Sequence, residues 1–192
     1  FGDVFGCIAV LQGQLLMPAH IHKSNTQGPE SQFAISHHAK SVGRPRPACS
    51  PTVVTENMTD NETRNVALIR NYLAALERGD AGDALRPFFA EDAVQIELPN
   101  ALNRHGRESD LEHLLQRSQQ GSKLLKRQQY QILSVIAHDD NVAVEARWTG
   151  VLAIAMGTMV PGTELRASFA MFFQLRGDRI AMQRNYDCFD PW

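Results

Sequence analysis

Three polar side chains alternate along the last predicted strand of the chain, residues 180–189. Gln183, Asn185 and Asp187 stand two positions apart, so in a strand they share one face. Asp187 is the one carboxylate on that face. A strand with such a face either exposes it to solvent or lines a pocket with it. In a pocket, Asp187 could take up and release a proton, as a general acid and base does.

Acid–base work near neutral pH requires a carboxyl group with a raised pKa. Phe169, Phe173 and Phe189 would provide apolar surroundings that raise the pKa of Asp187 by desolvation. The alternative is a hydrogen-bonded structural aspartate at a strand end. The choice depends on which face of the sheet is concave, and the alternating pattern leaves that open.

Other side chains could serve the same pocket. Tyr72 is either a polar group in the pocket or a core aromatic whose hydroxyl reaches the rim. Glu145, Arg147 and Thr149 share one strand face, as a pocket network or as cross-strand pairs on a solvated or dimer-facing surface. Trp148 points to the opposite face and fits the core or an interface.

Several kinds of chemistry find no support in the sequence. It has no phosphate-binding glycine loop, no HExxH zinc helix and no Gly-x-Ser-x-Gly elbow, so we expect no cofactor and no metal. Cys7, Cys49 and Cys188 lie far apart, which indicates free thiols in a reducing, cytoplasmic compartment.

The composition limits the kinds of partner that we expect for this chain. The 192 residues are 43% hydrophobic and 21% charged, with a net charge of −2, which suits a domain with a real core. The sequence has no basic patch interleaved with aromatic residues, so we expect no nucleic-acid partner. It has no apolar window of about 18 residues, so we expect no membrane span.

The first 58 residues differ from the rest. Proline, serine, glycine, glutamine and histidine dominate residues 18–58 without a helical or strand period, which predicts a disordered or non-native leader. Its histidines, at positions 20, 22, 37 and 38, fit a solvated segment better than a metal site. Met58 looks like a natural start, and residues 59–192 form the predicted domain.

The helices and strands of that domain are predicted from helix-capping residues, from apolar residues at helical or strand spacing, and from turn residues. Thr59 and Glu62 have capping-box spacing, and Gly79 ends the helix that they begin. A brief second helix is expected at residues 83–89 and a third at 108–119, with a strand at 94–98 between them. Four long strands are expected at 124–137, 142–154, 164–175 and 180–189.

Short turns between these long strands demand antiparallel hairpins. Helices first and a strand meander last is an α+β pattern. We therefore predict a cone-shaped, curved antiparallel sheet wrapped by three N-terminal helices around a buried pocket.

Residues 60–192 resemble the nuclear-transport-factor-2-like superfamily, and within it the SnoaL-like (polyketide cyclase) and ketosteroid-isomerase-like domains. The stretches that carry the resemblance are IRNYLAALERGD (69–80), PFFAEDAVQIELP (87–99), HGRESDLEHLL (105–115) and GDRIAMQRNYDCFDPW (177–192). The resemblance implies a cystatin-like α+β barrel that often pairs as a homodimer. The superfamily includes isomerases, cyclases, epoxide hydrolases, dehydratases and non-catalytic binding modules.

Ketosteroid isomerases place an oxyanion-donating tyrosine where Tyr72 stands. Their proton-shuttling aspartate precedes the proline that ends the first strand. Leu98 holds that place here, and Glu97 is one residue away, which in a strand means the other face. Their second acid falls near Met171, so the resemblance disfavours steroid isomerisation.

Two other branches of the superfamily carry a catalytic aspartate on a strand. Limonene-type epoxide hydrolases use Arg-x-Asp, and Arg147 is followed here by Trp148 and Thr149. SnoaL-like cyclases carry an acid/base aspartate after an aromatic residue on the final strand, which matches Asp187. His105 lies in a loop that the superfamily often places at the cavity mouth.

The sequence thus predicts a cofactor-independent isomerase, cyclase or lyase that acts by proton transfer on a small apolar or aromatic carbonyl compound. Asp187 would shuttle the proton and Tyr72 would donate to the oxyanion. The predicted pocket residues are Asn185, Gln183, Glu97, Phe169, Phe173 and His105. The alternative is a non-catalytic ligand-binding or dimerisation module.

Overall fold

A computed structural model describes residues 58–192 of the chain. The predicted leader, with its histidines and with Cys7 and Cys49, lies outside the described residues apart from Met58. None of the helices within residues 58–192 has the length and hydropathy needed to cross a bilayer.

The first helix, α1 (Asp60–Arg78), begins and ends where the sequence predicts. The Glu62 backbone N–H donates to the Thr59 hydroxyl at 3.2 Å, and the Thr59 backbone N–H donates to Glu62 Oε2 at 2.8 Å. Gly79 follows with φ 87°, a left-handed conformation that glycine adopts without steric cost. The helix buries the stripe that contains Ile69 and Tyr72.

The other two predicted helices differ from the prediction. The second is a 3₁₀ helix, η1 (Gly82–Phe88), with Pro87 inside it. The third, α2 (Leu111–Gly121), starts later than predicted because residues before it form a short strand, β2 (Arg107–Asp110). Asp110 caps α2 by accepting the His113 backbone N–H at 2.9 Å. The prediction of three helices is therefore confirmed only in part.

Six strands form one curved sheet in the order β2-β1-β6-β5-β4-β3. The strands besides β2 are β1 (Phe89–Glu97), β3 (Leu125–His138), β4 (Asn141–Leu152), β5 (Glu164–Leu175) and β6 (Ile180–Phe189). The three predicted hairpins that join β3 to β6 are antiparallel, as expected. Strands β2 and β3 do not pair with each other, so the sheet is not closed into a barrel.

One strand pair corrects the prediction of a wholly antiparallel sheet, because β1 runs parallel to β6. The two strands are far apart in sequence, so no hairpin fixes their relative direction. This pairing places the first strand within residues 58–192 beside the last.

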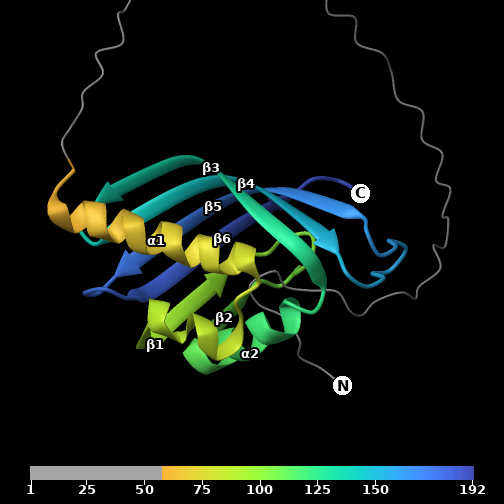
Figure 1. The fold of residues 1–192 in the computed structure, drawn as a ribbon, viewed down its shortest axis with the longest axis horizontal. Helices are drawn as coiled ribbons and strands as arrows, with labels where there is room; N and C mark the ends of the chain where they lie inside the picture. Colours follow the sequence, from red (N-terminus) through yellow and green to blue (C-terminus); the bar gives the residue numbers. More distant parts are fainter. Residues whose placement is uncertain (1–57) are drawn as a thin grey trace, which may run out of the picture. The chain divides into compact units, whose positions relative to one another are not determined.

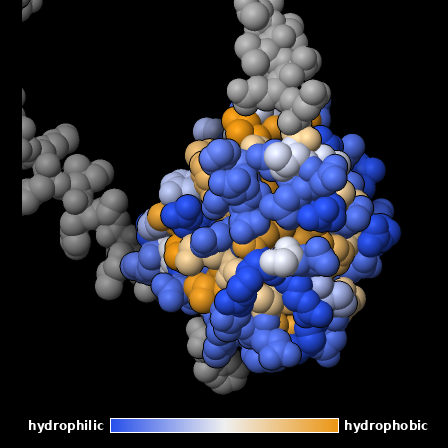
Figure 2. All heavy atoms as spheres, turned by 90° about the vertical axis from the view of Figure 1, so that its left-hand side faces the viewer, coloured by the Kyte–Doolittle hydropathy of each residue, from blue (hydrophilic) through white to orange (hydrophobic). Residues whose placement is uncertain are grey.

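Figure 1 shows the helices on one side of the sheet. Helix α1 lies along the sheet and packs mainly against β3, while α2 packs against η1, β1 and β2. The core fills the space between them and includes Leu73, Leu114, Trp148 and Phe173. At the end of the fold where α1 begins, the surface is mostly hydrophilic, with hydrophobic residues in small groups (Figure 2).

Candidate functional site

The strand register places five polar side chains together on the helix-covered face of the sheet. In the parallel pair, Gln95 lies beside Gln183 and Glu97 lies beside Asn185, with Asp187 two positions further along β6. We call these five residues of β1 and β6 the polar seam. Four of them are buried, and Asp187 is partly buried.

An apolar surface adjoins the polar seam on the next strand. In register across β5 and β6, Phe173 lies opposite Gln183, Met171 opposite Asn185 and Phe169 opposite Asp187. We call these three residues of β5 the apolar wall, and all three are buried. The inner face of the sheet therefore changes from polar to apolar between β6 and β5.

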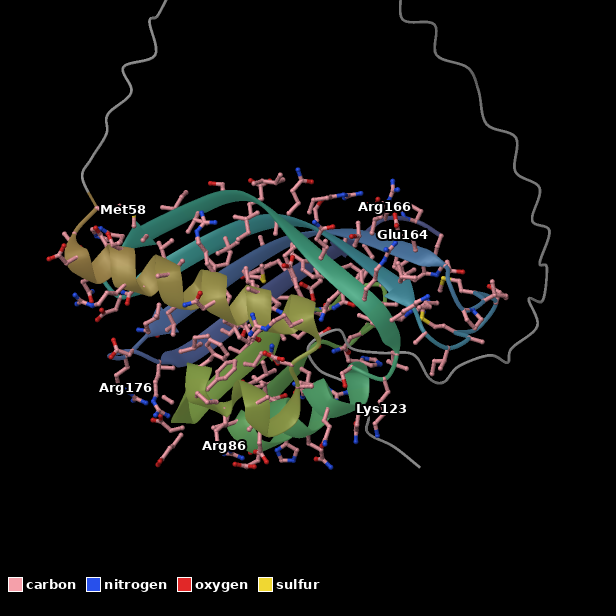
Figure 3. All side chains as sticks on the ribbon, in the orientation of Figure 1. Met58, Arg86, Lys123, Glu164, Arg166 and Arg176 are labelled. Carbon is pink, nitrogen blue, oxygen red and sulfur yellow. The ribbon has the colours of Figure 1, made fainter. Side chains whose placement is uncertain are left out.

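This arrangement inverts the usual pattern of a sheet with one solvated face. In β1 the polar Gln95 and Glu97 are buried, while the apolar Val94 and Ile96, which alternate with them, are only half-buried. The labelled charged side chains of Figure 3, such as Arg86 and Arg176, project from the outside of the fold. The polar seam lies inside, so its groups face the helices rather than water.

Asp187 is the most perturbed group of the polar seam. Its Oδ1 atom is enclosed and has no hydrogen-bond partner, although the residue as a whole is partly exposed. Burial, together with the charge of Glu97, raises the pKa of Asp187 from 3.8 to about 7. Such a carboxyl group can both accept and donate a proton near neutral pH.

Glu97 is held in place by the loop that follows β1. Asn100 donates from Nδ2 to Glu97 Oε1 at 2.8 Å, and its own Oδ1 accepts the backbone N–H groups of Leu102 and Asn103. Gly106 closes this loop with φ 63°, and a Cβ there would approach the Glu97 carbonyl oxygen to 2.7 Å. The loop thus fixes one carboxylate close enough to act on the other.

The rest of the polar seam is cross-linked by amide groups. Gln183 donates from Nε2 to Asn185 Oδ1 at 2.9 Å, while Gln183 Oε1 is enclosed without a partner. Asn103, in the loop after β1, has an enclosed Nδ2 that is also without a partner. The interior therefore holds unsatisfied acceptors and a donor, which a bound molecule could satisfy.

Arg117 of α2 brings a buried cation to the far end of the polar seam. It donates to Gln95 Oε1 at 3.1 Å and to the Ser109 hydroxyl. Five residues of this region are not predicted from the sequence, namely Gln95, Asn100, Asn103, Ser109 and Arg117. The signal that could have found Gln95 is the similar spacing of polar residues in Gln95-x-Glu97 and Gln183-x-Asn185-x-Asp187.

Tyr72 is fully buried in an aromatic cluster. Its ring packs edge-on against Phe89 and Phe173, at 5.3 and 6.2 Å between centroids, and is tilted against Phe88 at 5.6 Å. Phe173 is in register with Gln183, four residues before Asp187, which is about 13 Å along a strand. The ring of Tyr72 thus belongs to the opposite end of the apolar wall from Asp187.

Phe169 and Phe189 surround Asp187 instead. Their ring centroids are 5.9 Å apart, and Trp148 stacks on Phe169 at 5.5 Å. Trp148 is fully buried, which confirms that it faces the core. Two of the three predicted apolar neighbours, Phe169 and Phe189, therefore lie beside Asp187, whereas Phe173 lies at the level of Gln183.

The remaining sequence candidates lie elsewhere. His105 is exposed in the loop after β1, two residues before β2 begins. Glu145, Arg147 and Thr149 lie on the outer face of the sheet, where Arg147 bonds to Ser168 at 2.9 Å and pairs with Asp190. The structure therefore supports the interpretation of these three residues as a surface group and not as a pocket network.

Surface hollows occur away from the polar seam. One of about 120 Å³ lies between the ends of α1 and α2 and the start of β3, with Gly79, Ser118 and Gln128 in its walls. Asp187 does not line this hollow or the three others described for residues 58–192. The same residues contain no group of three or more potential metal ligands.

Solved structures share this architecture. A protein from Xanthomonas campestris pv. campestris, provisionally assigned as a polyketide cyclase, is 26% identical, with a TM-score of 0.55 over 66% of this chain and 91% of that chain. A protein from Jannaschia sp. CCS1, provisionally assigned as a SnoaL-like polyketide cyclase, is 19% identical, with a TM-score of 0.57 over 69% and 90%. A protein with a ketosteroid isomerase-like fold from Catenulispora acidiphila DSM 44928 is 19% identical, with a TM-score of 0.50 over 62% and 83%.

A search of curated proteins found no match. The sequence model of the SnoaL-like domain matches residues 69–183, which is more than half of the chain. These residues run from α1 into β6 and include the polar seam as far as Gln183. The chain therefore belongs to the family of SnoaL-like domains.

Proposed function

We propose that this protein binds a small apolar or aromatic carbonyl compound inside the fold and moves a proton on it through Asp187. The observation that carries the proposal is the Asp187 carboxyl group, with one enclosed oxygen that lacks a partner, beside Phe169 and Phe189. A group placed in this way can exchange protons with a ligand bound beside it.

The chemistry would be enolate-type proton transfer without a cofactor. The Asp187 carboxylate removes a proton from the carbon next to the carbonyl, and the electron pair moves onto the carbonyl oxygen. The protonated carboxyl then returns the proton to another position of the ligand. A pKa of about 7 makes both forms of Asp187 abundant near neutral pH.

Tyr72 enters the proposal as the donor to the developing oxyanion, as the sequence predicts. Its ring lies about 13 Å along the strand direction from the level of Asp187, whereas the oxyanion forms on the carbonyl next to the carbon that Asp187 deprotonates. A ligand served by both groups would therefore need a conjugated system that carries the negative charge along the apolar wall. Loss of the hydroxyl in Tyr72→Phe would reduce turnover if this role holds. An unchanged rate in a less stable variant would make Tyr72 a core residue.

Binding without chemistry is the second candidate function. Leu98 and Met171 stand where ketosteroid isomerases have their acids, which favours it. In that case the amides of the polar seam recognise the ligand and Asp187 is one more polar contact.

Two measurements separate these functions. The first is an NMR titration of the Asp187 side-chain carboxyl, for which we expect a midpoint near 7. The second is enzyme-dependent exchange of the protons next to the carbonyl of 2-tetralone into D₂O, which we expect Asp187→Asn to abolish. Asp178→Asn, in the exposed turn before β6, is the matched control.

A midpoint near the ordinary value of about 3.9, or exchange that Asp187→Asn leaves unchanged, would rule out proton transfer by this residue. Saturable binding of the ketone without exchange would support the binding module.

A further inference from the structure

Two enclosed side-chain atoms of the polar seam lack a hydrogen-bond partner, and both are acceptors. Asp187 Oδ1 and Gln183 Oε1 are both enclosed without a hydrogen-bond partner, and Gln183 is only 1% exposed. Both side chains lie on the inner face of β6. A ligand that satisfies them must donate hydrogen bonds, so it needs N–H or O–H groups.

The charges of the same region favour a cation. Glu97 and Asp187 place two carboxyl groups inside, and the one buried cation among residues 58–192 is Arg117, which bonds to Gln95 and Ser109. Arg107 of β2 is in register with Glu97 but is partly exposed, and no ion pair joins those two side chains. His105 is exposed, and β5 faces Asp187 with the uncharged Phe169 and Met171.

Aromatic rings complete the surroundings. Phe169 and Phe189 lie 5.9 Å apart beside Asp187, and Trp148 lies within 6.0 Å of both rings. Aromatic faces attract ammonium groups, and the attraction grows when water is excluded. Asp187 beside these rings, with Glu97 one strand pair away at the level of Asn185, forms a chemical setting that suits a protonated amine.

We infer that the ligand of this site carries a protonated amine, seated between Glu97 and Asp187 against Phe169 and Phe189. The inference rests on the proposed binding function and adds the ligand class to it. An ammonium group there would donate to the unpartnered Asp187 oxygen and offset the two negative charges. It would also keep Asp187 ionised, which is the form that removes protons.

The test compares two probes that share a ring and differ in charge, benzylamine and benzyl alcohol. We expect benzylamine to bind at least tenfold more tightly at pH 8, measured by NMR chemical-shift changes. Alkyl ammonium groups lose their proton only near pH 10, so the amine stays charged between pH 6 and 8. Its affinity should rise severalfold across that range as Asp187 ionises.

Variants locate the binding. Asp187→Asn should weaken benzylamine at least tenfold, and Glu97→Gln severalfold, with little change for benzyl alcohol. The glutamine keeps a carbonyl acceptor for Asn100, so Glu97→Gln should preserve the loop. Asp178→Asn should bind both probes like the native protein.

Equal affinity for the two probes would overturn the inference. So would benzylamine binding that neither Asp187→Asn nor Glu97→Gln weakens, since the amine would then bind elsewhere. In either case, a raised Asp187 pKa and ketone proton exchange would remain, so the proposed function would be judged separately.

Discussion

At the scale of single residues, the surroundings that suit Asp187 for proton transfer also lower the stability of the fold. Its carboxyl group has given up water on one oxygen without gaining a hydrogen bond, and Glu97 adds a second negative charge nearby. Both effects favour the neutral form in the folded protein, whereas the unfolded chain ionises it at its ordinary pKa. Ionised Asp187 therefore destabilises the fold.

This opposition predicts how stability depends on pH. Between about pH 4 and pH 7 the folded state keeps a proton on Asp187 that the unfolded state releases. The contribution of Asp187 to the unfolding free energy therefore falls as pH rises and levels off above pH 7. Each pKa unit corresponds to about 1.4 kcal/mol, so raising the pKa from 3.8 to about 7 costs up to roughly 4 kcal/mol. In Asp187→Asn, the decrease in unfolding free energy between pH 5 and pH 8 that comes from Asp187 should be absent. Urea unfolding curves at these pH values measure it. Equal pH dependence in both proteins would contradict the prediction.

Glu97 should act on Asp187 through its charge. Removing that charge in Glu97→Gln should lower the pKa of Asp187 below about 7, though not to its ordinary value, because burial is the larger cause. NMR titration of Asp187 in the variant measures this directly. An unchanged midpoint would mean that burial alone sets the pKa.

At the scale of elements, the loop of residues 98–106 and the strands β1 and β6 form the site together. Strand β1 supplies Glu97, the loop supplies Asn100, and Gly106 lets the loop pass close to the strand. The parallel pairing of β1 with β6 then brings Glu97 into register with Asn185.

Gly106 provides a test of this loop with a matched control. Gly106→Ala meets both a positive φ and a contact of 2.7 Å with the Glu97 carbonyl oxygen, whereas Gly157→Ala, with φ 56°, meets open space. We expect Gly157→Ala to cost about 1 kcal/mol of unfolding free energy and Gly106→Ala about 1–3 kcal/mol more. Gly106→Ala should also shift the Asp187 titration. Equal losses of stability in the two variants would argue against a close approach.

Gly150 of β4 makes room for Trp148. A Cβ at residue 150 would lie 2.3 Å from two atoms of the Trp148 ring, which is fully buried. Gly150→Ala should therefore cost about 1–3 kcal/mol in urea unfolding, and Thr149→Ala on the outer face much less. A near-neutral Gly150→Ala would show that the indole ring can shift.

At the scale of the whole molecule, the outer face of the sheet exposes several apolar side chains. Ile136, Ala143, Phe172 and Arg184 form one row across β3 to β6, and Ile136 and Phe172 are 67% and 42% exposed. The exposed Tyr186 packs edge-on against Phe172 at 5.7 Å. We propose that this face pairs with a second copy of the chain, as the resemblance implies.

Sedimentation velocity tests the pairing. We expect a dimer at micromolar concentration for the native protein and a monomer for Phe172→Glu, because the new charge would be buried in the interface. Val160→Glu, at an exposed apolar residue in the loop before β5, should leave the dimer intact. A native protein that stays monomeric at high concentration would refute the proposal.

The sequence by itself determined what depends on neighbouring residues: the ends of α1, set by Thr59, Glu62 and Gly79, and the three hairpins that join β3 to β6. Pro87 likewise predicted that the second helix would be brief. Only the tertiary structure decided that Gln183, Asn185 and Asp187 face inward, because an alternating pattern reads the same from either side of a sheet. It also decided the parallel pairing of β1 with β6, which joins segments about 90 residues apart and so leaves no local signal. That pairing places Glu97 near Asp187, where its negative charge adds to the larger effect of burial in raising the pKa of Asp187.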